Sequence, residues 1–173
     1  MRDSMFIGLD VHKATISVAV AQDGRGGEVR HWGTVPHRPD HIRKLVEKFS
    51  AGGSRLHFCY EAGPCGYGLH RQLVELGHDC IVVAPSLIPV KAGDRVKTDR
   101  RDAVMLAKLH RAGELTAVWV PDAAHEAMRD LVRARATAMR VPGKARQHLQ
   151  GFCCATVVSI WVRKAGRLPT AAG

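Results

Sequence analysis

The sequence lacks the long apolar runs and paired cysteines of membrane-spanning and disulfide-built proteins. No segment approaches the roughly 18 apolar residues that cross a bilayer. The first apolar run meets charge again within a few residues, unlike a signal peptide, so we expect a cytoplasmic protein. The five cysteines are odd in number and form no CxxC pair. This argues against a disulfide framework or a zinc ribbon and predicts buried or idle thiols.

Acidic residues are scarce in the second half of the chain. Residues 1–90 contain 10 Lys and Arg against 9 Asp and Glu, a net charge of +1, whereas residues 91–173 contain 16 against 7, a net charge of +9. This asymmetry favours a polyanionic partner, most simply nucleic acid, although a solvated basic surface has the same composition. The 46% hydrophobic and 24% charged content is typical of a globular chain with a real core.

Apolar alternation and turn residues predict an α/β fold for the first 120 residues. The expected strands are 5–10, 14–22, 28–35, 54–63 and 78–85, and the expected helices are 40–53, 66–77 and 99–112. The first three strands are joined by short connections, which predicts an antiparallel meander. This order fits the ribonuclease H-like architecture, a RuvC-like domain with a mixed sheet, while periodicity alone leaves other α/β folds open.

The remaining chain is predicted to be less regular. Residues 114–121 favour a short strand, and residues 122–139 favour a long basic helix without a sharp apolar stripe. Pro142-Gly143 is expected to interrupt that helix, and periodicity is lost after Gln150. We therefore divide the chain into a domain over 1–120, a basic helical linker over 121–150 and an irregular tail over 151–173.

Four carboxylates stand where an α/β fold concentrates its chemistry. Asp10 ends the first predicted strand, Glu61 ends the fourth, and Asp99 and Asp102 share one face at the start of a later helix. Converging carboxylates repel each other unless divalent cations neutralise them, and oxygen ligands suit Mg²⁺ or Mn²⁺. Two such ions roughly 4 Å apart can catalyse phosphodiester chemistry.

Two of the acids also have a simpler interpretation. An acid in the first turn of a helix, such as Asp99, commonly interacts favourably with the helix dipole. Glu61, at a strand end, can simply face solvent. Asp10 is harder to explain in this way because it closes a run of core-like residues. The basic neighbours Lys97, Arg100 and Arg101 fit a phosphate backbone held beside the acids.

Several segments resemble one family. They are "FIGLDVHKATISVAV", "YEAGPCGYGLHRQL", "VVAPSLIPVKAGDRVKTDRRDAVMLAKLHRAGELTAVWVP" and "LVRARATAM", and they resemble the DEDD transposases of bacterial insertion sequences. The resemblance implies a RuvC-like domain of an RNA-guided recombinase that acts on DNA with Mg²⁺ or Mn²⁺. It also implies a guide (bridge) RNA and a homo-oligomer as possible partners.

The resemblance assigns roles residue by residue. Asp10, Glu61, Asp99 and Asp102 match the catalytic, metal-binding D-E-D-D set. His12 and Lys13 match the family's "DVHK" and are interpreted as neighbours of the site, not ligands.

Members of this family are about twice as long and carry a C-terminal domain with a nucleophilic serine. Ser159 matches nothing in that domain, so no serine is assigned. A shifted reading frame of the back-translated tail can read "LLRHGRIY", as the family does there. We therefore expect residues after about Gln150 to be off-frame. Complete transposition is then not expected of this chain, whereas nucleic-acid binding through residues 91–146 is.

Three alternatives remain open. The first apolar hairpin also resembles the phosphate loop of actin-like ATPases and sugar kinases, but "CYEAGPCGYG" (59–68) supplies neither their second Asp-x-Gly hairpin nor their adenosine loop. A free-standing RuvC-like nuclease needs the same four acids without the serine. An inert nucleic-acid-binding remnant needs only the basic surface, and its binding depends on salt but not on a metal.

Overall fold

The computed structural model describes residues 3–24, 26–89 and 98–155. By contacts the chain divides into two compact units, Met1–Val120 and Pro121–Gly173. Within the described ranges, no helix combines the length and apolar character needed to cross a membrane.

The first unit is built on one five-stranded mixed sheet. Its strands are β1 (Ser4–Val11), β2 (Thr15–Gln22), β3 (Val29–Pro36), β4 (Arg55–Glu61) and β5 (Asp79–Val83). Their order is β3-β2-β1-β4-β5, with β2 antiparallel to both neighbours and β1, β4 and β5 parallel. An antiparallel meander followed by parallel crossovers is the predicted ribonuclease H-like α/β fold, which is confirmed.

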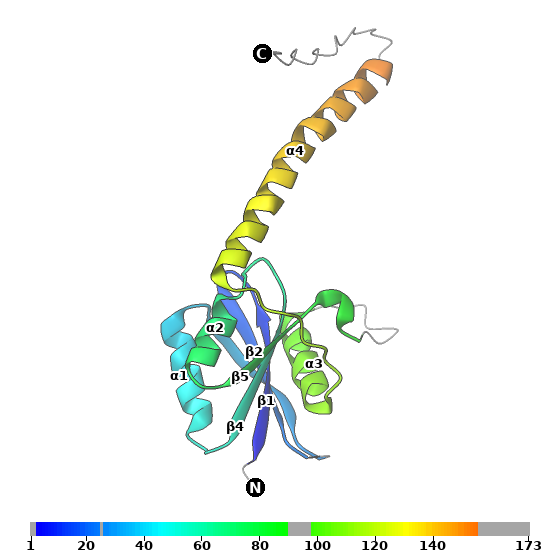
Figure 1. Ribbon diagram of the computed structural model, residues 1–173. Helices are drawn as coiled ribbons and strands as arrows, with labels where there is room; N and C mark the ends of the chain where they lie inside the picture. The colour runs from blue at the N-terminus through cyan, green and yellow to red at the C-terminus, as the bar shows by residue number, and fades with distance from the viewer. Residues whose placement is uncertain (1–2, 25, 90–97, 156–173) are drawn as a thin grey trace. The chain divides into compact units, whose positions relative to one another are not determined.

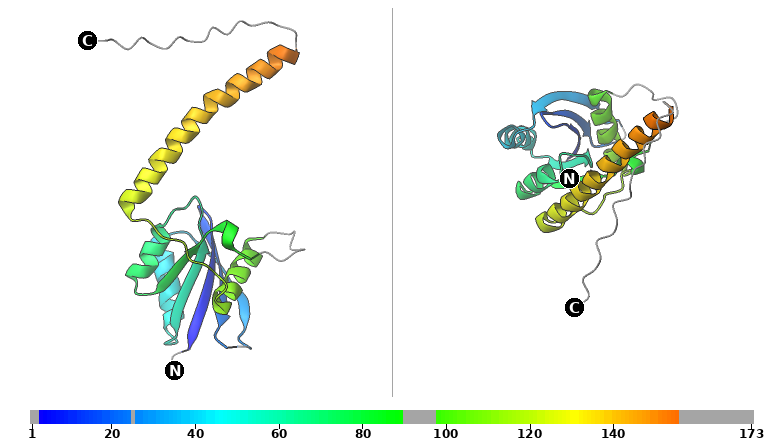
Figure 2. Two further views of the ribbon diagram at one scale, coloured as in Figure 1. Left: turned by 45° about the vertical axis from the view of Figure 1, so that its right-hand side comes forward. Right: turned by 90° about the horizontal axis from the view of Figure 1, so that it is seen from above.

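Helices cover both faces of this sheet. Helices α1 (Pro39–Ser50) and α2 (Gly68–Glu75) lie on one face and α3 (Asp99–Ala112) on the other, as Figures 1 and 2 show. A short 3-10 turn, η1 (Pro85–Leu87), follows β5 and was not predicted from the sequence. The predicted strand over 114–121 is reduced to one bridge to the β5 edge, between Val83 and Ala117.

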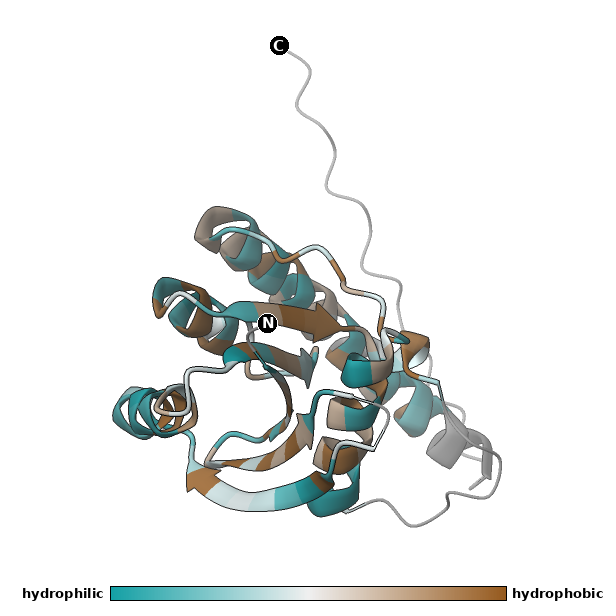
Figure 3. Ribbon diagram, turned by 90° about the horizontal axis from the view of Figure 1, so that it is seen from below, coloured by the Kyte–Doolittle hydropathy of each residue, from teal (hydrophilic) through white to brown (hydrophobic). Residues whose placement is uncertain are grey.

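Large aliphatic and aromatic residues fill the face under α1 and α2. The strands alternate, so every second residue points to this side. The buried set comprises Ile7, Leu9, Ile16, Val18, Val20, Leu56, Phe58, Tyr60 and Val82 from the sheet and Ile42, Leu45, Val46, Phe49, Leu69 and Leu73 from the helices. Figure 3 shows long brown stretches along the strands, interrupted by white and teal positions, and mostly teal turns on the outer side of α1.

Small residues form the opposite face, under α3. Ala19 and Ala21 of β2 pack against Ala103 and Ala107 of α3. On β1, a methyl group added at Gly8 would overlap the Ala103 carbonyl oxygen and the Ala107 amide nitrogen. Glycine is therefore required there for the close approach of helix and strand. Residues two apart on a strand point to the same face, so Asp10, like Gly8, lies on the face covered by α3.

The prediction of unpaired thiols is confirmed for Cys59, Cys65 and Cys80. Burial raises the pKa of Cys59 above its ordinary value and that of Cys80 to about 12. Both thiols therefore stay protonated at neutral pH and are poor nucleophiles. The side chains of Cys153 and Cys154 lie outside those described.

The second unit contains one long helix, α4 (Ala123–Ala155). The predicted interruption at Pro142-Gly143 is wrong, since the helix runs through both residues. A proline removes one backbone hydrogen bond, and the bonds of the turns on either side can keep the helix continuous. Helix α4 continues to Ala155, so the first five residues of the range predicted as an irregular tail are helical. Residues 156–173 lie outside the described part of the chain.

Candidate metal centre

Asp10 lies near the carboxyl end of β1, on the face covered by α3. Its register partner on β2 is Ser17, and directly opposed residues of an antiparallel pair point to the same side. The Asp10 side chain is 17% exposed. Burial is the main cause that raises its pKa, and the nearby charges of Asp99 and Asp102 add to it, while His12 acts in the opposite direction. The raised pKa therefore reflects a carboxylate that is short of solvent and close to other acids.

Glu61 ends β4 beside Asp10. The parallel register pairs Leu9 with Tyr60, so the next residues along the two strands, Asp10 and Glu61, are neighbours. Two residues before Glu61, the Cys59 thiol donates a hydrogen bond to the Leu106 carbonyl of α3 at 3.5 Å. Strand alternation therefore orients Glu61 to the same side as Asp10. Asp10 is the last but one residue of β1 and Glu61 the last of β4, so both acids lie at the carboxyl ends of adjacent parallel strands.

Helix α3 brings the other two acids to this edge. Thr98 is its N-cap, and the threonine hydroxyl oxygen accepts a hydrogen bond from the Arg101 amide at 3.3 Å. Asp99 and Asp102 occupy the first turn, with Asp99 exposed and Asp102 half-buried. One turn further on, buried Ala103 packs against β2 and fixes the position of this turn on the sheet.

His12 joins the acids from the hairpin between β1 and β2. Its Nε2 lies 3.1 Å from Asp10 Oδ2 and 3.5 Å from Asp99 Oδ1. The ligand atoms of Asp10, His12 and Asp99 all lie within 4.8 Å of one another, a spacing that can hold a metal ion. The Asp10 charge is the main cause that raises the pKa of His12. The sequence interpretation of His12 as a neighbour of the acids agrees with these two contacts. The "DVHK" motif was the available signal.

The predicted phosphate-binding residues divide into two groups. Arg100 and Arg101 are exposed in the first turn of α3, next to the acids. Lys97 lies outside the described residues. The two arginines therefore supply positive charge at the rim of the acidic cluster.

Sequence reasoning missed a polar pair that begins next to Asp10, formed by buried Ser17 and half-buried His31. Ser17 is 3% exposed, and its hydroxyl lies 3.0 Å from His31 Nε2. These two residues come from neighbouring strands and belong to no motif. Only the sheet register brings them to the site.

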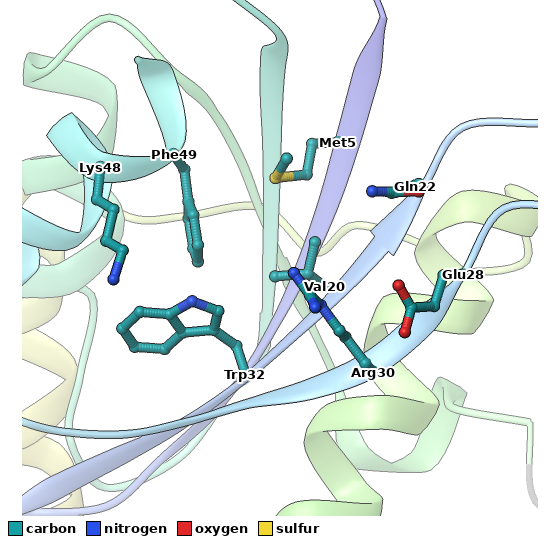
Figure 4. Close-up of a pocket in the computed structure, with 8 residues that line it drawn as sticks. All are labelled: Met5, Val20, Gln22, Glu28, Arg30, Trp32, Lys48 and Phe49. Atoms are coloured by element: carbon teal, nitrogen blue, oxygen red, sulfur yellow. The ribbon is translucent and has the colours of Figure 1, made fainter. Parts of the chain in front are cut away.

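A separate cavity of about 190 Å³ lies toward the other end of β1 and β2, shown in Figure 4. Its lining residues are Met5, Val20, Gln22, Glu28, Arg30, Trp32, Lys48 and Phe49. The Lys48 ammonium stands over the Trp32 ring, 5.1 Å from its centroid. None of the four acids lines this cavity, so it is separate from the acidic cluster.

The mixed sheet, with its antiparallel meander and parallel crossovers, has a ribonuclease H-like, RuvC-like topology, and a comparison with family models identifies the family. Residues 7–153 match the transposase family called DEDD, IS110 type. The chain belongs to this family of DEDD transposases.

Two curated relatives are similar to the chain over most of its length. The "Putative transposase y4qE" of Sinorhizobium fredii is 58% identical over 147 residues, 85% of this chain and 38% of the relative. The "Transposase for insertion sequence element IS1533" of Leptospira borgpetersenii is 37% identical over 153 residues, 88% of this chain and 44% of the relative. The chain thus spans less than half the length of either relative.

Among solved structures, the T. thermophilus RuvC in complex with a Holliday junction substrate is 10% identical, with a TM-score of 0.41. The match covers 66% of this chain and 99% of that chain.

Proposed function

We propose that this domain binds divalent cations and takes part in phosphodiester cleavage and strand transfer during DNA transposition. Asp10, Glu61, Asp99 and Asp102 are the proposed metal ligands and catalytic residues. The observation that carries the proposal is the convergence of Asp10 of β1 with Asp99 of α3, whose ligand atoms lie within 4.8 Å of each other and of His12. The pKa of Asp10, raised mainly by burial and further by the charges of Asp99 and Asp102, is consistent with this crowding. Membership of the transposase family supports the same assignment.

The donor set fits a hard divalent cation. Carboxylate oxygens are preferred by Mg²⁺ and Mn²⁺. A carboxylate that is 17% exposed and close to two further acids is unfavourable when ionised, and a cation would relieve both the burial and the repulsion. When bound, such an ion polarises phosphate oxygens and lowers the pKa of a water or hydroxyl nucleophile.

The chain's own residues would then divide the work. Asp10 and Glu61, held by two central strands, orient the metal from a rigid base. Asp99 and Asp102 complete the set from α3, whose close packing against Gly8 holds the helix in place. Arg100 and Arg101, with Lys97, contact the phosphate backbone and position the scissile bond near the acids. Their charge accounts for the basic flank of an acidic site.

The proposed substrate is DNA, and the basic second half of the chain is proposed to bind it. A guide RNA and a second copy of the chain are further proposed partners, on the strength of the family alone.

Calorimetric titration of Mg²⁺ and Mn²⁺ into the 173-residue chain tests the metal assignment. We expect saturable binding that is lost in an Asp10→Ala/Asp102→Ala double variant. An Asp40→Ala variant, which removes an exposed acid from α1 on the other face of the sheet, is the matched control and should bind as the parent does. Equal heats for the parent and the double variant would refute the site.

DNA binding is tested with the same proteins. We expect an Arg100→Ala/Arg101→Ala variant to bind DNA more weakly, with a reduced dependence of affinity on salt. A DNA affinity that is unchanged in this variant would place the DNA-binding surface elsewhere. A DNA affinity that depends neither on the metal nor on the four acids would favour a nucleic-acid-binding remnant over an enzyme.

A further inference from the structure

His12 is held in place by backbone contacts on both sides. Its amide donates to the Thr15 carbonyl at 2.9 Å, and its own carbonyl accepts from His37 Nδ1 at 2.8 Å. The His37 amide also donates to the Ala14 carbonyl at 2.9 Å. Hydrogen bonds within the hairpin and to His37, just after β3, thus fix the backbone position from which the His12 imidazole extends.

One nitrogen of this ring contacts two acids from different elements. Nε2 lies 3.1 Å from an Asp10 oxygen of β1 and 3.5 Å from an Asp99 oxygen of α3. The His125–Asp122 pair, at 2.8 Å, joins residues three apart on one stretch of chain, whereas the two acids at His12 come from a strand and a helix that are distant in the sequence. The three ligand atoms, one each from Asp10, His12 and Asp99, lie within 4.8 Å of one another, so a single ion could contact all three.

We propose that His12 is a nitrogen ligand of the metal held by Asp10 and Asp99, and that it makes the site prefer Mn²⁺ to Mg²⁺. This inference rests on the proposed function, because it needs the carboxylates to bind a cation. An imidazole nitrogen is a softer donor than a carboxylate oxygen and suits transition metals, whereas Mg²⁺ prefers an all-oxygen shell. The side chain of His12 is 51% exposed and that of Asp10 is 17% exposed. The imidazole is therefore accessible to an ion from solvent, while Asp10 lies deeper.

Pulsed electron paramagnetic resonance of the full chain loaded with Mn²⁺ tests the nitrogen directly. We expect a ¹⁴N coupling to Mn²⁺ in the parent protein that is absent from His12→Gln. His125→Gln, which removes an exposed histidine from the other unit, should retain the coupling. Asp10→Asn should lose most of the bound Mn²⁺ signal altogether.

Calorimetry with the same variants measures the preference. His12→Gln should weaken Mn²⁺ binding by at least about 10-fold and Mg²⁺ binding by clearly less, so that the ratio of the two affinities falls. Asp10-dependent Mn²⁺ binding without a nitrogen coupling, or with equal losses for both metals, would refute the His12 ligand and leave the carboxylate site standing. No Asp10-dependent binding of either metal would refute the carboxylate site, and the His12 ligand with it.

Discussion

On one face of the sheet the strands present isoleucine, leucine, valine, phenylalanine and tyrosine to α1 and α2. On the other face they present mostly small or polar residues to α3, namely glycine, alanine, serine, cysteine, histidine and aspartate, with Phe6 as a large exception. The first face buries large apolar area, the main favourable contribution to folding. The second face lets α3 approach so closely that acids on a helix and acids on strands can meet. Stability and site geometry are thus assigned to opposite sides of the same strands.

Truncation of the large-residue face should have the largest effect on stability. Phe58 is fully buried on β4. Phe58→Ala is expected to lower the free energy of unfolding by about 3–5 kcal/mol, since it removes buried apolar area and leaves a cavity. Denaturant titration followed by circular dichroism measures the loss. Val74→Ala, at a side chain that is 49% exposed on α2, should stay within about 0.5 kcal/mol of the parent. Comparable losses at both positions would contradict this account of the first face.

Enlargement of the small-residue face should cost less stability but more function. Gly8→Ala is expected to destabilise the domain by about 1–3 kcal/mol, because the new methyl group meets backbone atoms of α3 that have no rotamer to change. Displacement of α3 should also weaken Mg²⁺ binding. Gly68→Ala places a methyl group where no atom lies within 4 Å and is the matched control. A Gly8→Ala protein with unchanged metal affinity would mean that α3 need not approach this closely.

The second face should also carry a pH dependence of stability. His110 of α3 packs against the edge of Phe6 and near His57, with ring centroids 5.4 and 6.4 Å apart respectively. Burial, with the nearby His57, lowers the pKa of His110 to about 4 from an ordinary 6.5. As the pH falls from 6.5 toward 4, the unfolded state therefore takes up a proton that the folded state refuses, and stability declines. The stability that His110 contributes is complete above pH 6.5.

His110→Phe removes this titration. After allowance for solvent screening of a partly exposed group, the parent should lose on the order of 1–2 kcal/mol across that interval that the variant does not lose. Thermal melts in metal-free buffer at several pH values measure the difference. His125→Gln should keep the parental slope, and a His110→Phe protein with that same slope would show that another group dominates.

The smallest predicted effect is a gain in stability. The raised pKa of Asp10 means that its ionised form opposes folding at neutral pH, a penalty that disappears as the pH falls and the carboxyl is protonated in both states. Asp10→Asn should therefore raise the melting temperature slightly at neutral pH in the presence of a chelator, and the gain should shrink on acidification. Excess Mg²⁺ should reverse the order. At 100 times its dissociation constant a ligand stabilises the protein that binds it by about 2.7 kcal/mol. A metal-free Asp10→Asn protein less stable than the parent would show that the carboxylate's contact with His12 outweighs its burial.

Local patterns predicted most elements of the first unit. Alternation and turn residues identified all five strands, and the apolar spacing of Ile42, Leu45, Val46 and Phe49 identified α1. The misses have physical causes. Residues 114–121 read as a strand but form one bridge, because strand propensity does not create a partner along a sheet edge. Pro142 was expected to interrupt α4, although one lost hydrogen bond need not end a long helix.

For the site, the sequence by itself determined which acids were candidates, through their positions at strand ends and in a helical first turn. Only the tertiary structure decided which residues lie beside each of these acids. The register of β1 with β4 brings Glu61 beside Asp10, and the register of β1 with β2 sets Ser17 opposite Asp10. The hairpin turns His12 onto Asp10 and Asp99. The approach of Glu61 and Asp99 to Asp10 depends on strand pairing and on the closeness that Gly8 allows, and it joins segments that are distant in the chain. Charge, periodicity and propensity act over a few neighbouring residues, whereas the convergence of ligand atoms is a property of the packed sheet.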